Sequence, residues 1–369
     1  MNSKFLFVFG TRPECIKMSP LILEAKRRQL DFKVCFTGQH MDMAQPILDF
    51  FEIKPDYSFG LMKQGQTLVG ISLSVMEKLQ AVIEANEFTH IIVQGDTTSG
   101  AIAGMTAFYN KLQVVHVEAG LRTYDLSSPW PEEFNRRLLS LASTWHFTPS
   151  SQSTENLKNE NYNSKQNFQV GNTGIDALRI ALEKINLLND KEEIQNEKFK
   201  ILVTLHRREN FGNEMQQIMI GIKEILNKYK DKIQVLWPIH QNPNVRKSFQ
   251  FVFNELPENL TVIEPLGYID FIKQMQKCDL IITDSGGIQE EAPFLGKPVL
   301  ICRNNTERPE AVSCGSALIV GTSKNILIES IETMITKGSE YQNMSKARFP
   351  YGDGHASKKI FDLILRTEN

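Results

Sequence analysis

The chain has 369 residues, of which 41% are hydrophobic and 23% charged, a composition typical of soluble globular proteins. This length exceeds one ordinary hydrophobic core, so two domains are expected. Lys and Arg number 41 against 43 Asp and Glu, which gives a formal net charge of −2. A nucleic-acid-binding protein usually carries a basic surplus, so the composition argues against such a partner.

No targeting or membrane segment is expected. The first apolar run, from Phe5 to Phe9, is shorter than the roughly 7–15 residues of a signal-peptide core and suits a buried strand. No run approaches the ~20 apolar residues of a membrane span. The five cysteines are odd in number and show no CxxC pairing, which favours reduced thiols. We therefore expect a cytoplasmic protein without a membrane partner.

Short apolar runs alternate with helical segments along the chain. The predicted strands of the first half are LFVFG, KVCFTG, HIIVQG and QVVHVEAG, with helices near 16–28 and 101–109. Those of the second half are KILVTLH, QVLWPIH, LTVIEPL, LIITDSGG and PVLIC, with helices near 213–229 and 269–276. The strands lack polar alternation, which indicates parallel strands buried on both faces. The predicted class is α/β, with two Rossmann-like doubly wound sheets; the polar tract 184–200 is expected to be a surface helix or linker.

The segment TDSGGIQEEA, residues 283–292, is the strongest candidate for an anion site. A helix is expected to begin at about Gly287, where its first N–H groups are free to bind an anion. Gly286 and Gly287 allow close approach of the backbone, and Ser285 adds a hydroxyl. Glu291 follows within one turn and could accept both hydroxyls of a ribose. The alternative is a tight turn with acidic residues favoured by the helix dipole.

Cationic residues in two other loops could bind phosphate. Arg303 and Arg308 belong to RNNTERPE, and Arg12 and Lys17 belong to GTRPECIK. An arginine presents a planar fork of donors that matches phosphate. The alternatives are a solvated charge run for the former and a capped turn for the latter. Together with the 283–292 segment, these cations would clamp one diphosphate across a cleft.

Three acidic loops supply candidate acid and base groups. Asp96 in GDTTS and Glu118 in HVEAGLRT follow adjacent predicted strands, while Glu132 and Glu133 begin a helix in SPWPEEFNRR. Such residues can simply cap helices. If they converge on one site, they would raise one another's pKa and could serve as acid/base catalysts.

Two histidines complete the candidate site. His206 lies in TLHRREN beside two arginines, and His240 lies in PIHQNPNVR. A structural role is the alternative for His240. The histidines lack metal-ligand spacing, and no GxGxxG motif for a dinucleotide occurs, so neither a metal nor a cofactor is expected.

The motifs as an ordered set resemble the non-hydrolysing UDP-N-acetylglucosamine 2-epimerases. They run from residue 9 to residue 354 and read FGTRPECIKMSP, TGQH, GDTTS, HVEAGLRT, SPWPEEFNRR, VGNTGIDAL, HRREN, PIHQNPNVR, TDSGGIQEEAP, TERPE and PYGDG. The resemblance implies a GT-B fold whose active site lies in the cleft between two Rossmann-like domains. It places an N-terminal domain at 1–172, joined by a C-terminal helix at 355–369, and a UDP-binding domain at 173–354.

The implied reaction interconverts UDP-GlcNAc and UDP-ManNAc. UDP is eliminated to leave a 2-acetamidoglucal, and then adds back with the proton delivered to the other face of C2. The resemblance also implies a UDP-sugar as the ligand and a homodimer as the assembly. By motif, the catalytic positions are Lys17, Asp96, Glu118, Glu132 and His206. The substrate and UDP positions are Arg12, His240, Ser285, Gly286, Gly287, Glu291 and Arg308. Asp96 is the first choice for the base at C2.

Departures from the family pattern bear on regulation and on the sugar. Met41 and Asp42 follow TGQH, and Gly65 stands where an arginine is usual, in the region where bacterial members bind a second UDP-GlcNAc as activator. That activation is therefore in doubt. Leu205 and the Asn304–Asn305 pair replace the usual residues near the nucleotide and could reflect a modified hexosamine. The other functions to be weighed are a hydrolysing 2-epimerase, a GT-B glycosyltransferase and a non-catalytic nucleotide-sugar sensor.

Overall fold

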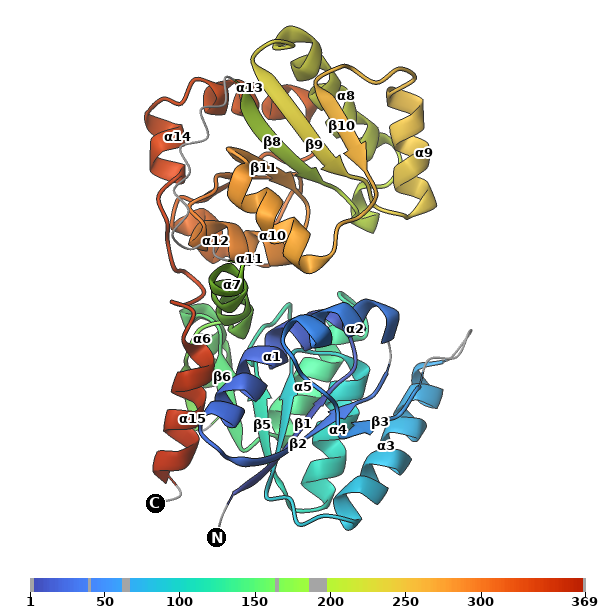
Figure 1. The fold of residues 1–369 in the computed structure, drawn as a ribbon, viewed down its shortest axis with the longest axis vertical. Coiled ribbons are helices and arrows are strands. Elements are labelled where there is room, and N and C mark those ends of the chain that lie inside the picture. The colour runs from blue at the N-terminus through green and yellow to red at the C-terminus, as the bar shows by residue number, and fades with distance from the viewer. Residues whose placement is uncertain (1–2, 39–40, 62–66, 163–165, 186–197, 368–369) are drawn as a thin grey trace. The chain divides into compact units, whose positions relative to one another are not determined.

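The computed structural model describes residues 3–38, 41–61, 67–162, 166–185 and 198–367. The chain divides into two compact units (Figure 1). Unit 1 contains Met1–Ile180 and Tyr351–Asn369, and unit 2 contains Ala181–Pro350. Most of the polar tract expected to be a surface helix or linker, residues 186–197, lies outside the described residues.

Unit 1 is built on a seven-stranded sheet in which every recorded strand pair is parallel. Its first strand carries the pattern KFLFVF and is buried from its second residue onward, as the unbroken apolar run predicted. In spatial order the strands are β3 (Tyr57–Ser58), β2 (Asp31–Phe36), β1 (Lys4–Phe9), β4 (His90–Gln94), β5 (Gln113–Val117), β6 (Trp145–Thr148) and β7 (Asn167–Gln169).

Helices of unit 1 pack in two groups, α1 with α2 and α15, and α3 with α4 and α5 (Figure 1). The helix expected near residues 16–28 begins four residues earlier, because Thr11 caps it and Pro13 suits its first turn. The helices are α1 (Arg12–Arg27), α2 (Met41–Phe50), α3 (Leu68–Glu84), α4 (Thr98–Tyr109), α5 (Glu132–Ala142), α6 (Ser151–Asn159), α15 (Ala356–Thr367) and α7 (Thr173–Lys184), which continues beyond Ile180 into unit 2.

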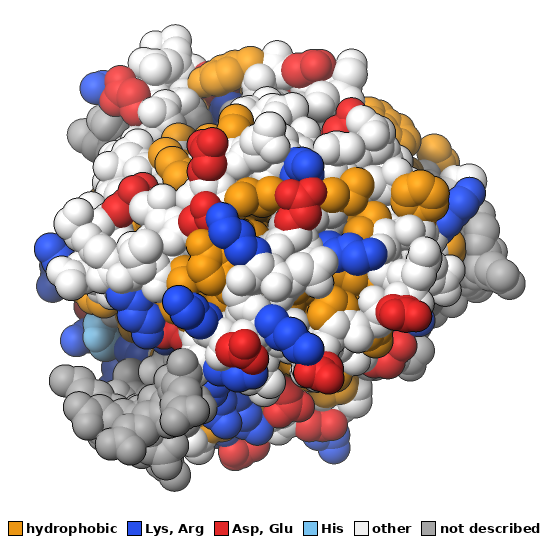
Figure 2. Space-filling model, turned by 90° about the horizontal axis from the view of Figure 1, so that it is seen from above, with side chains coloured by type: hydrophobic (Ala, Val, Ile, Leu, Met, Phe, Trp, Pro, Cys, Tyr) orange, Lys and Arg blue, Asp and Glu red, His pale blue; other side chains and the backbone are white. Residues whose placement is uncertain are grey.

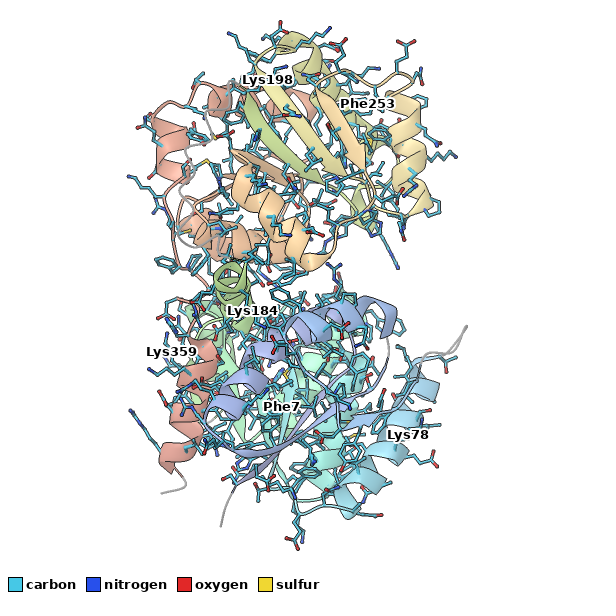
Figure 3. The ribbon with its side chains drawn as sticks, in the orientation of Figure 1. Phe7, Lys78, Lys184, Lys198, Phe253 and Lys359 are labelled. Carbon is cyan, nitrogen blue, oxygen red and sulfur yellow. The ribbon has the colours of Figure 1, made fainter. Side chains whose placement is uncertain are left out.

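The core of unit 1 is aromatic and aliphatic on both sides of the sheet. Phe7 on β1 is fully buried, and its ring meets Phe32 edge to face at 5.7 Å (Figure 3). The C-terminal helix α15 packs on α1, where Arg28 binds Asp362 at 2.7 Å. Asp176 accepts hydrogen bonds from the first amides of α15 and so caps it.

Unit 2 repeats the plan with six strands, and every recorded pair is again parallel. The spatial order is β10 (Leu260–Ile263), β9 (Ile233–Pro238), β8 (Phe199–Thr204), β11 (Leu280–Thr283), β12 (Val299–Ile301) and β13 (Ala317–Ile319). The helices are η1 (Arg208–Asn210, a 3₁₀ turn), α8 (Asn213–Lys228), α9 (Pro243–Val252), α10 (Tyr268–Lys277), α11 (Gly286–Phe294), α12 (Pro309–Ser313), α13 (Lys324–Ile335) and α14 (Ser339–Met344).

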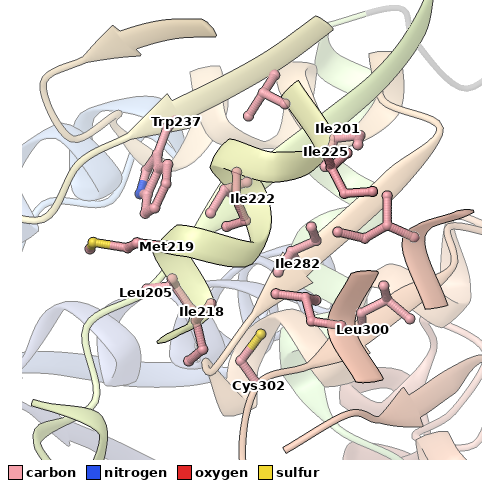
Figure 4. Packing of buried hydrophobic residues seen from close by; sticks show 14 of the residues in the cluster. Ile201, Leu205, Ile218, Met219, Ile222, Ile225, Trp237, Ile282, Leu300 and Cys302 are labelled. Carbon is pink, nitrogen blue, oxygen red and sulfur yellow. The ribbon is translucent and has the colours of Figure 1, made fainter. Parts of the chain in front are cut away.

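Helix α8 supplies the centre of the unit 2 core. Its residues Ile218, Met219 and Ile222 are at most 1% exposed and belong to the same cluster as Trp237 of β9 (Figure 4). Their spacing of three and four residues is the apolar stripe of an amphipathic helix. This packing holds the strands whose ends carry His206 and the 283–292 segment.

Each sheet has one topological switch point, where the strand order reverses. In unit 1 it lies between β1 and β4, and in unit 2 between β8 and β11. Ligands of open α/β sheets bind beyond the carboxyl ends of the strands at such points. The candidate loops after β1 and β4, and after β8 and β11, therefore stand where the architecture places a ligand.

The surface carries charges of both signs. On the face in Figure 2, Lys and Arg side chains are interspersed with Asp and Glu, in keeping with a net charge of −2. Across the residues that the structure describes, no helix is long and apolar enough to cross a membrane.

Candidate active site

Asp96 and Glu118 extend from the same edge of the unit 1 sheet. Strands β4 and β5 are adjacent and parallel, with Gln94 opposite Val117 at their carboxyl ends. Asp96 follows the first strand by two residues, and Glu118 follows the second directly. The sequence-based prediction that these strands are neighbours is confirmed.

Glu118 is held by three side chains that donate to a single oxygen. Its Oε2 accepts Lys17 Nζ at 2.5 Å, Gln94 Nε2 at 2.9 Å and Asn172 Nδ2 at 3.4 Å. The Lys17 and Glu118 side chains are only 16% and 8% exposed, so water screens this ion pair weakly. The structure thus joins two predicted site residues that are 101 positions apart in the chain.

The backbone at Glu118 adopts an unusual conformation. Its φ of +64° lies in the left-handed region, which costs a non-glycine residue roughly 1–2 kcal/mol. Two residues later Gly120 has a φ of +86°, and a Cβ there would lie 2.2 Å from the carbonyl oxygen of Ser153. Strained backbone of this kind is concentrated at functional sites, where the surrounding structure fixes it.

Asp96 is held by α5. Arg136 donates from Nε and Nη2 to Asp96 Oδ2, at 2.9 and 2.8 Å, and Asn135 Nδ2 donates to the Asp96 backbone carbonyl at 2.9 Å. Arg136 also lies 3.3 Å from Glu133. The arginine therefore fixes the carboxylate that the sequence favoured as the base.

Glu132 and Glu133 begin α5, as predicted, but their surroundings differ. Glu133 is fully buried and accepts the backbone N–H groups of Thr123 and Tyr124 at 3.0 and 3.2 Å. Burial raises the pKa of Glu133, but these two bonds and Arg136 outweigh it, so the pKa lies below its usual range. Glu132 instead has a buried Oε2 with no hydrogen-bond partner among the described residues. A buried carboxylate oxygen without a partner is costly.

Arg12 is the first residue of α1 and is partly exposed. Just before it, Thr11 and Glu14 form a reciprocal capping box: the Glu14 carboxylate accepts the Thr11 N–H at 2.8 Å. The loop is therefore a capped turn, as the alternative interpretation held. The Arg12 guanidinium is nevertheless partly exposed beside the switch point.

In unit 2, His206 lies at the carboxyl end of β8 beside a buried carboxylate. Asp284 is 0% exposed and accepts the backbone N–H groups of His206 and Arg207 at 3.0 and 2.9 Å. His206 Nδ1 lies 3.2 Å from Asp284 Oδ1. Burial lowers the pKa of His206, and Asp284 opposes this. Asp284 therefore links β11 to the histidine loop.

His240 is exposed at the end of β9, and its ring stacks on that of His206 with centroids 5.5 Å apart. The Asn242 N–H donates to His240 Nδ1 at 3.1 Å, which places the proton of the neutral ring on Nε2. The two predicted histidines are thus brought together. The ring of His240 also helps to lower the pKa of His206, since two imidazolium charges would repel.

The glycine-rich segment forms the expected helix start. Helix α11 begins at Gly286, with Ser285 as its N-cap, and the Ser285 side chain makes no capping hydrogen bond. A Cβ at Gly287 would meet no heavy atom within 4 Å, and one at Gly286 would meet only Arg207 Nη2, at 3.6 Å. The amides of this first turn are therefore approachable, as an anion site requires.

The remaining predicted binding residues belong to ion pairs or to the rim of α11. Arg308 binds Glu290 through Nε, and both side chains are nearly buried. Glu291 is partly exposed on the same helix. Arg303 is buried and pairs with Glu209 at 2.5 Å. The ion pair of Arg308 makes it a fixed feature of the loop, so the solvated-charge alternative does not hold for it.

Sequence reasoning did not single out four polar residues that hold the predicted ones: Gln94, Asn172, Arg136 and Asp284. Asn172, Arg136 and Asp284 belong to motifs that the sequence analysis had identified. The sequence did not predict which residues they bind. Gln94 gave one signal, a polar residue that ends a strand after three apolar ones. Among the described residues, no group of three or more His, Cys, Asp or Glu could hold a metal ion.

Known proteins of one family resemble this chain over nearly its whole length. The family model described as UDP-N-acetylglucosamine 2-epimerase matches residues 23–365. A UDP-N-acetylglucosamine 2-epimerase of Campylobacter jejuni is 44% identical over 383 residues, spanning 100% of this chain and 99% of the relative. The crystal structure of UDP-GlcNAc 2-epimerase from Neisseria meningitidis bound to UDP-GlcNAc superposes with a TM-score of 0.90, at 45% identity, covering 98% of this chain and 100% of that one.

A more distant structural neighbour bears on the fold alone. The glycosyltransferase of kitacinnamycin has a TM-score of 0.67 at 12% identity, covering 99% of both chains. The two Rossmann-like units are thus of the GT-B class shared by epimerases and glycosyltransferases. At full-length coverage and more than 40% identity, the chain belongs to the UDP-N-acetylglucosamine 2-epimerase family.

Proposed function

We propose that the protein catalyses the reversible, non-hydrolysing epimerisation of UDP-GlcNAc to UDP-ManNAc. The observation that carries this proposal is the set of three carboxylates, Asp96, Glu118 and Glu132, which follow β4 and β5 or begin α5. Inversion at C2 requires a base on one face of the sugar and an acid on the other. A transferase that leaves C2 untouched has no need of this set.

The proposed reaction balances as an elimination followed by an addition. A carboxylate takes the C2 proton, the C–H electron pair forms the C1–C2 double bond, and the C1–O bond to UDP breaks. The intermediate is a 2-acetamidoglucal beside UDP. A phosphate oxygen of UDP then bonds to C1, while an acid delivers a proton to the opposite face of C2. No oxidant or reductant is consumed, in line with the expectation that no cofactor is required.

Unit 1 supplies the acid and base groups in this proposal. Asp96 remains the first choice for the base, and its pairing with Arg136 would hold the carboxylate in place for the reacting carbon. Glu132 is a candidate for the opposite face, because its buried Oε2 lacks a partner among the described residues. Lys17, bound to Glu118, supplies a positive charge near the group that it orients.

Unit 2 supplies the nucleotide site. We propose that the diphosphate binds at the start of α11, on the amides after Ser285 and at Gly286 and Gly287, where the helix dipole favours an anion. Glu291 would accept the ribose hydroxyls. His206, His240, Arg12 and Arg308 would contribute further contacts to UDP, with His206 assisting its departure. The N. meningitidis relative is described as bound to UDP-GlcNAc, which supports a UDP-sugar as the ligand here.

The proposal includes a cytoplasmic homodimer. Helices α3, α4 and α5 pack side by side and expose large apolar side chains, among them Leu73 at 63%, Tyr109 at 68% and Leu141 at 73%. Exposed apolar side chains on neighbouring helices suit burial against a second copy. Sedimentation equilibrium should give twice the chain mass of 42.1 kDa. A monomer at micromolar concentration would contradict this part.

The test of function is one incubation followed by proton NMR. With UDP-GlcNAc in D₂O, we expect UDP-ManNAc to accumulate, with deuterium at C2 of product and of recovered substrate. Free ManNAc with stoichiometric UDP would instead identify a hydrolysing 2-epimerase. Retention of the original hydrogen at C2 would exclude proton abstraction and favour a glycosyltransferase. No turnover of UDP-GlcNAc, but turnover of a modified UDP-hexosamine, would indicate a different sugar.

A further inference from the structure

Glu14 is a buried carboxylate at the switch point of unit 1 that the proposed reaction does not use. Its exposure is 1%, and it lies in the first turn of α1. Burial raises the pKa of Glu14, and hydrogen bonds from Thr11 and Thr97 oppose that change. A carboxyl group is rarely buried to this extent without specific partners, so its contacts need an explanation.

Four donors converge on the two oxygens of Glu14. The Oε2 atom accepts the backbone N–H groups of Gly10 and Thr11 at 3.1 and 2.8 Å, and the Thr11 hydroxyl at 2.7 Å. The Oε1 atom accepts the hydroxyl of Thr97 at 2.8 Å. A capping box needs only the first oxygen. The second oxygen reaches a residue 83 positions away, on the loop after β4.

Thr97 completes the link on the other side. It is the N-cap of α4, and its Oγ1 accepts the N–H of Gly100 at 3.0 Å while donating to Glu14. Gly100 leaves room for this arrangement, since a Cβ there would lie 3.2 Å from Thr97 Oγ1 and 3.5 Å from Glu14 Oε1. Asp96 directly precedes Thr97, and Lys17 lies one turn beyond Glu14 on α1.

We propose that Glu14 is a positioning residue, whose buried carboxylate fixes the loop of Asp96 against the helix that carries Lys17, acting through Thr97. The inference rests on the proposed function, because Asp96 and Lys17 are the groups that it positions. Displacement of a catalytic group by about 1 Å can lower turnover a hundredfold. The link therefore serves the placement of the Asp96 loop relative to the helix that carries Lys17, and not helix capping alone.

The test compares Thr97→Val, Thr97→Ser and Glu14→Gln. Thr97→Val removes the hydroxyl that donates to Glu14, whereas Thr97→Ser keeps it. We expect kcat to fall about tenfold to a hundredfold in Thr97→Val and Glu14→Gln, with Thr97→Ser near wild type. The KM for UDP-GlcNAc should change less than kcat in all three, because Arg12 is the only one of the proposed UDP contacts that lies in unit 1. The double variant Glu14→Gln with Thr97→Val should be no slower than the slower single one, since both break one link.

Thr67→Val is the matched control. Thr67 is the N-cap of α3 and accepts the Gly70 N–H at 3.1 Å, but no carboxylate holds its hydroxyl among the described residues. This variant loses the same kind of cap and should keep wild-type kcat. Equal losses of kcat in Thr67→Val and Thr97→Val, additive losses in the double variant, or full activity of Glu14→Gln would each overturn the proposal.

Hydrogen exchange separates this inference from the proposed function. Amides of residues 10–11 and 97–100 should exchange faster in Thr97→Val and Glu14→Gln than in wild type, whereas Thr67→Val should leave both segments unchanged. If wild type fails to epimerise UDP-GlcNAc, the proposed function falls, and exchange still decides whether Glu14 ties the two loops. Unchanged exchange at residues 10–11 in Thr97→Val would overturn the tie itself.

Discussion

Replacement of Glu118 by glutamine should separate catalysis from stability at the centre of unit 1. The amide oxygen of the glutamine can occupy the position of Oε2 and still accept hydrogen bonds from Lys17, Gln94 and Asn172. The negative charge opposite Lys17 is lost, however, at a site where the two side chains are 16% and 8% exposed. A hydrogen bond to a charged group contributes about 1.5–3 kcal/mol, so we expect unfolding to become easier by about 2 kcal/mol. For a unit of this size that corresponds to roughly 4–8 °C in Tm.

The effect of Glu118→Gln on turnover should be far larger than its effect on stability. Loss of a general acid or base costs about 10²–10⁴-fold in rate. We would measure UDP-ManNAc formation by NMR, UDP affinity by calorimetry and Tm by scanning calorimetry. UDP affinity should be retained, because Glu118 is not among the proposed UDP contacts.

Glu332→Gln is the control for this experiment. Glu332 also binds a lysine, Lys228, at 2.6 Å, but the pair lies on the surface of unit 2 with the lysine 61% exposed. Activity should be unchanged in that variant. Glu118→Gln with wild-type turnover would refute the catalytic assignment. A loss of turnover that only follows the loss of folded protein would show that the role of Glu118 is structural.

Three further predictions follow from the site and its surroundings. Asp96→Asn and Glu132→Gln should each lower kcat about 10²–10⁴-fold while sparing UDP affinity, and normal turnover in both would exclude them as acid and base. Gly65, which lies outside the described residues, stands where an arginine is usual in the activator region. The rate curve for UDP-GlcNAc should therefore be hyperbolic, and UDP-ManNAc should react without added UDP-GlcNAc. A sigmoidal curve, with no reverse reaction until UDP-GlcNAc is added, would contradict this. Burial lowers the pKa of His116 from its ordinary value of 6.5 to about 3. Between pH 6.5 and pH 3 the histidine is therefore protonated in the unfolded state but not in the folded state. The free energy of unfolding should fall as the pH drops through that window. Urea unfolding should show a weaker pH dependence over that window in His116→Gln, and an unchanged slope would refute the assignment.

The sequence alone determined the fold class and the loops of interest. Unbroken apolar runs such as FLFVF are typical of strands buried on both faces, and their regular alternation with helical segments predicts parallel sheets. The same rule placed polar motifs at the carboxyl ends of strands, where the structure has them. Strands β3, β6, β7 and β13 were not predicted. β3 has only two residues, and the patterns of β6 and β7, WHFT and NFQ, mix polar with apolar residues, so they lack the unbroken apolar run that marked the other strands.

The tertiary structure decided the partners of the candidate residues. Lys17 was expected to bind an anion at the start of its helix, and it binds Glu118, 101 positions away, because strand order brings β1 beside β4 and β5 beside β4. Asp284 and Glu14 lay within the predicted turn and capped-turn segments without a role of their own, and each proves to be a buried acceptor for several donors. Sequence spacing encodes which residues share a local face. Contacts across a sheet depend on the order of strands, which that spacing does not contain.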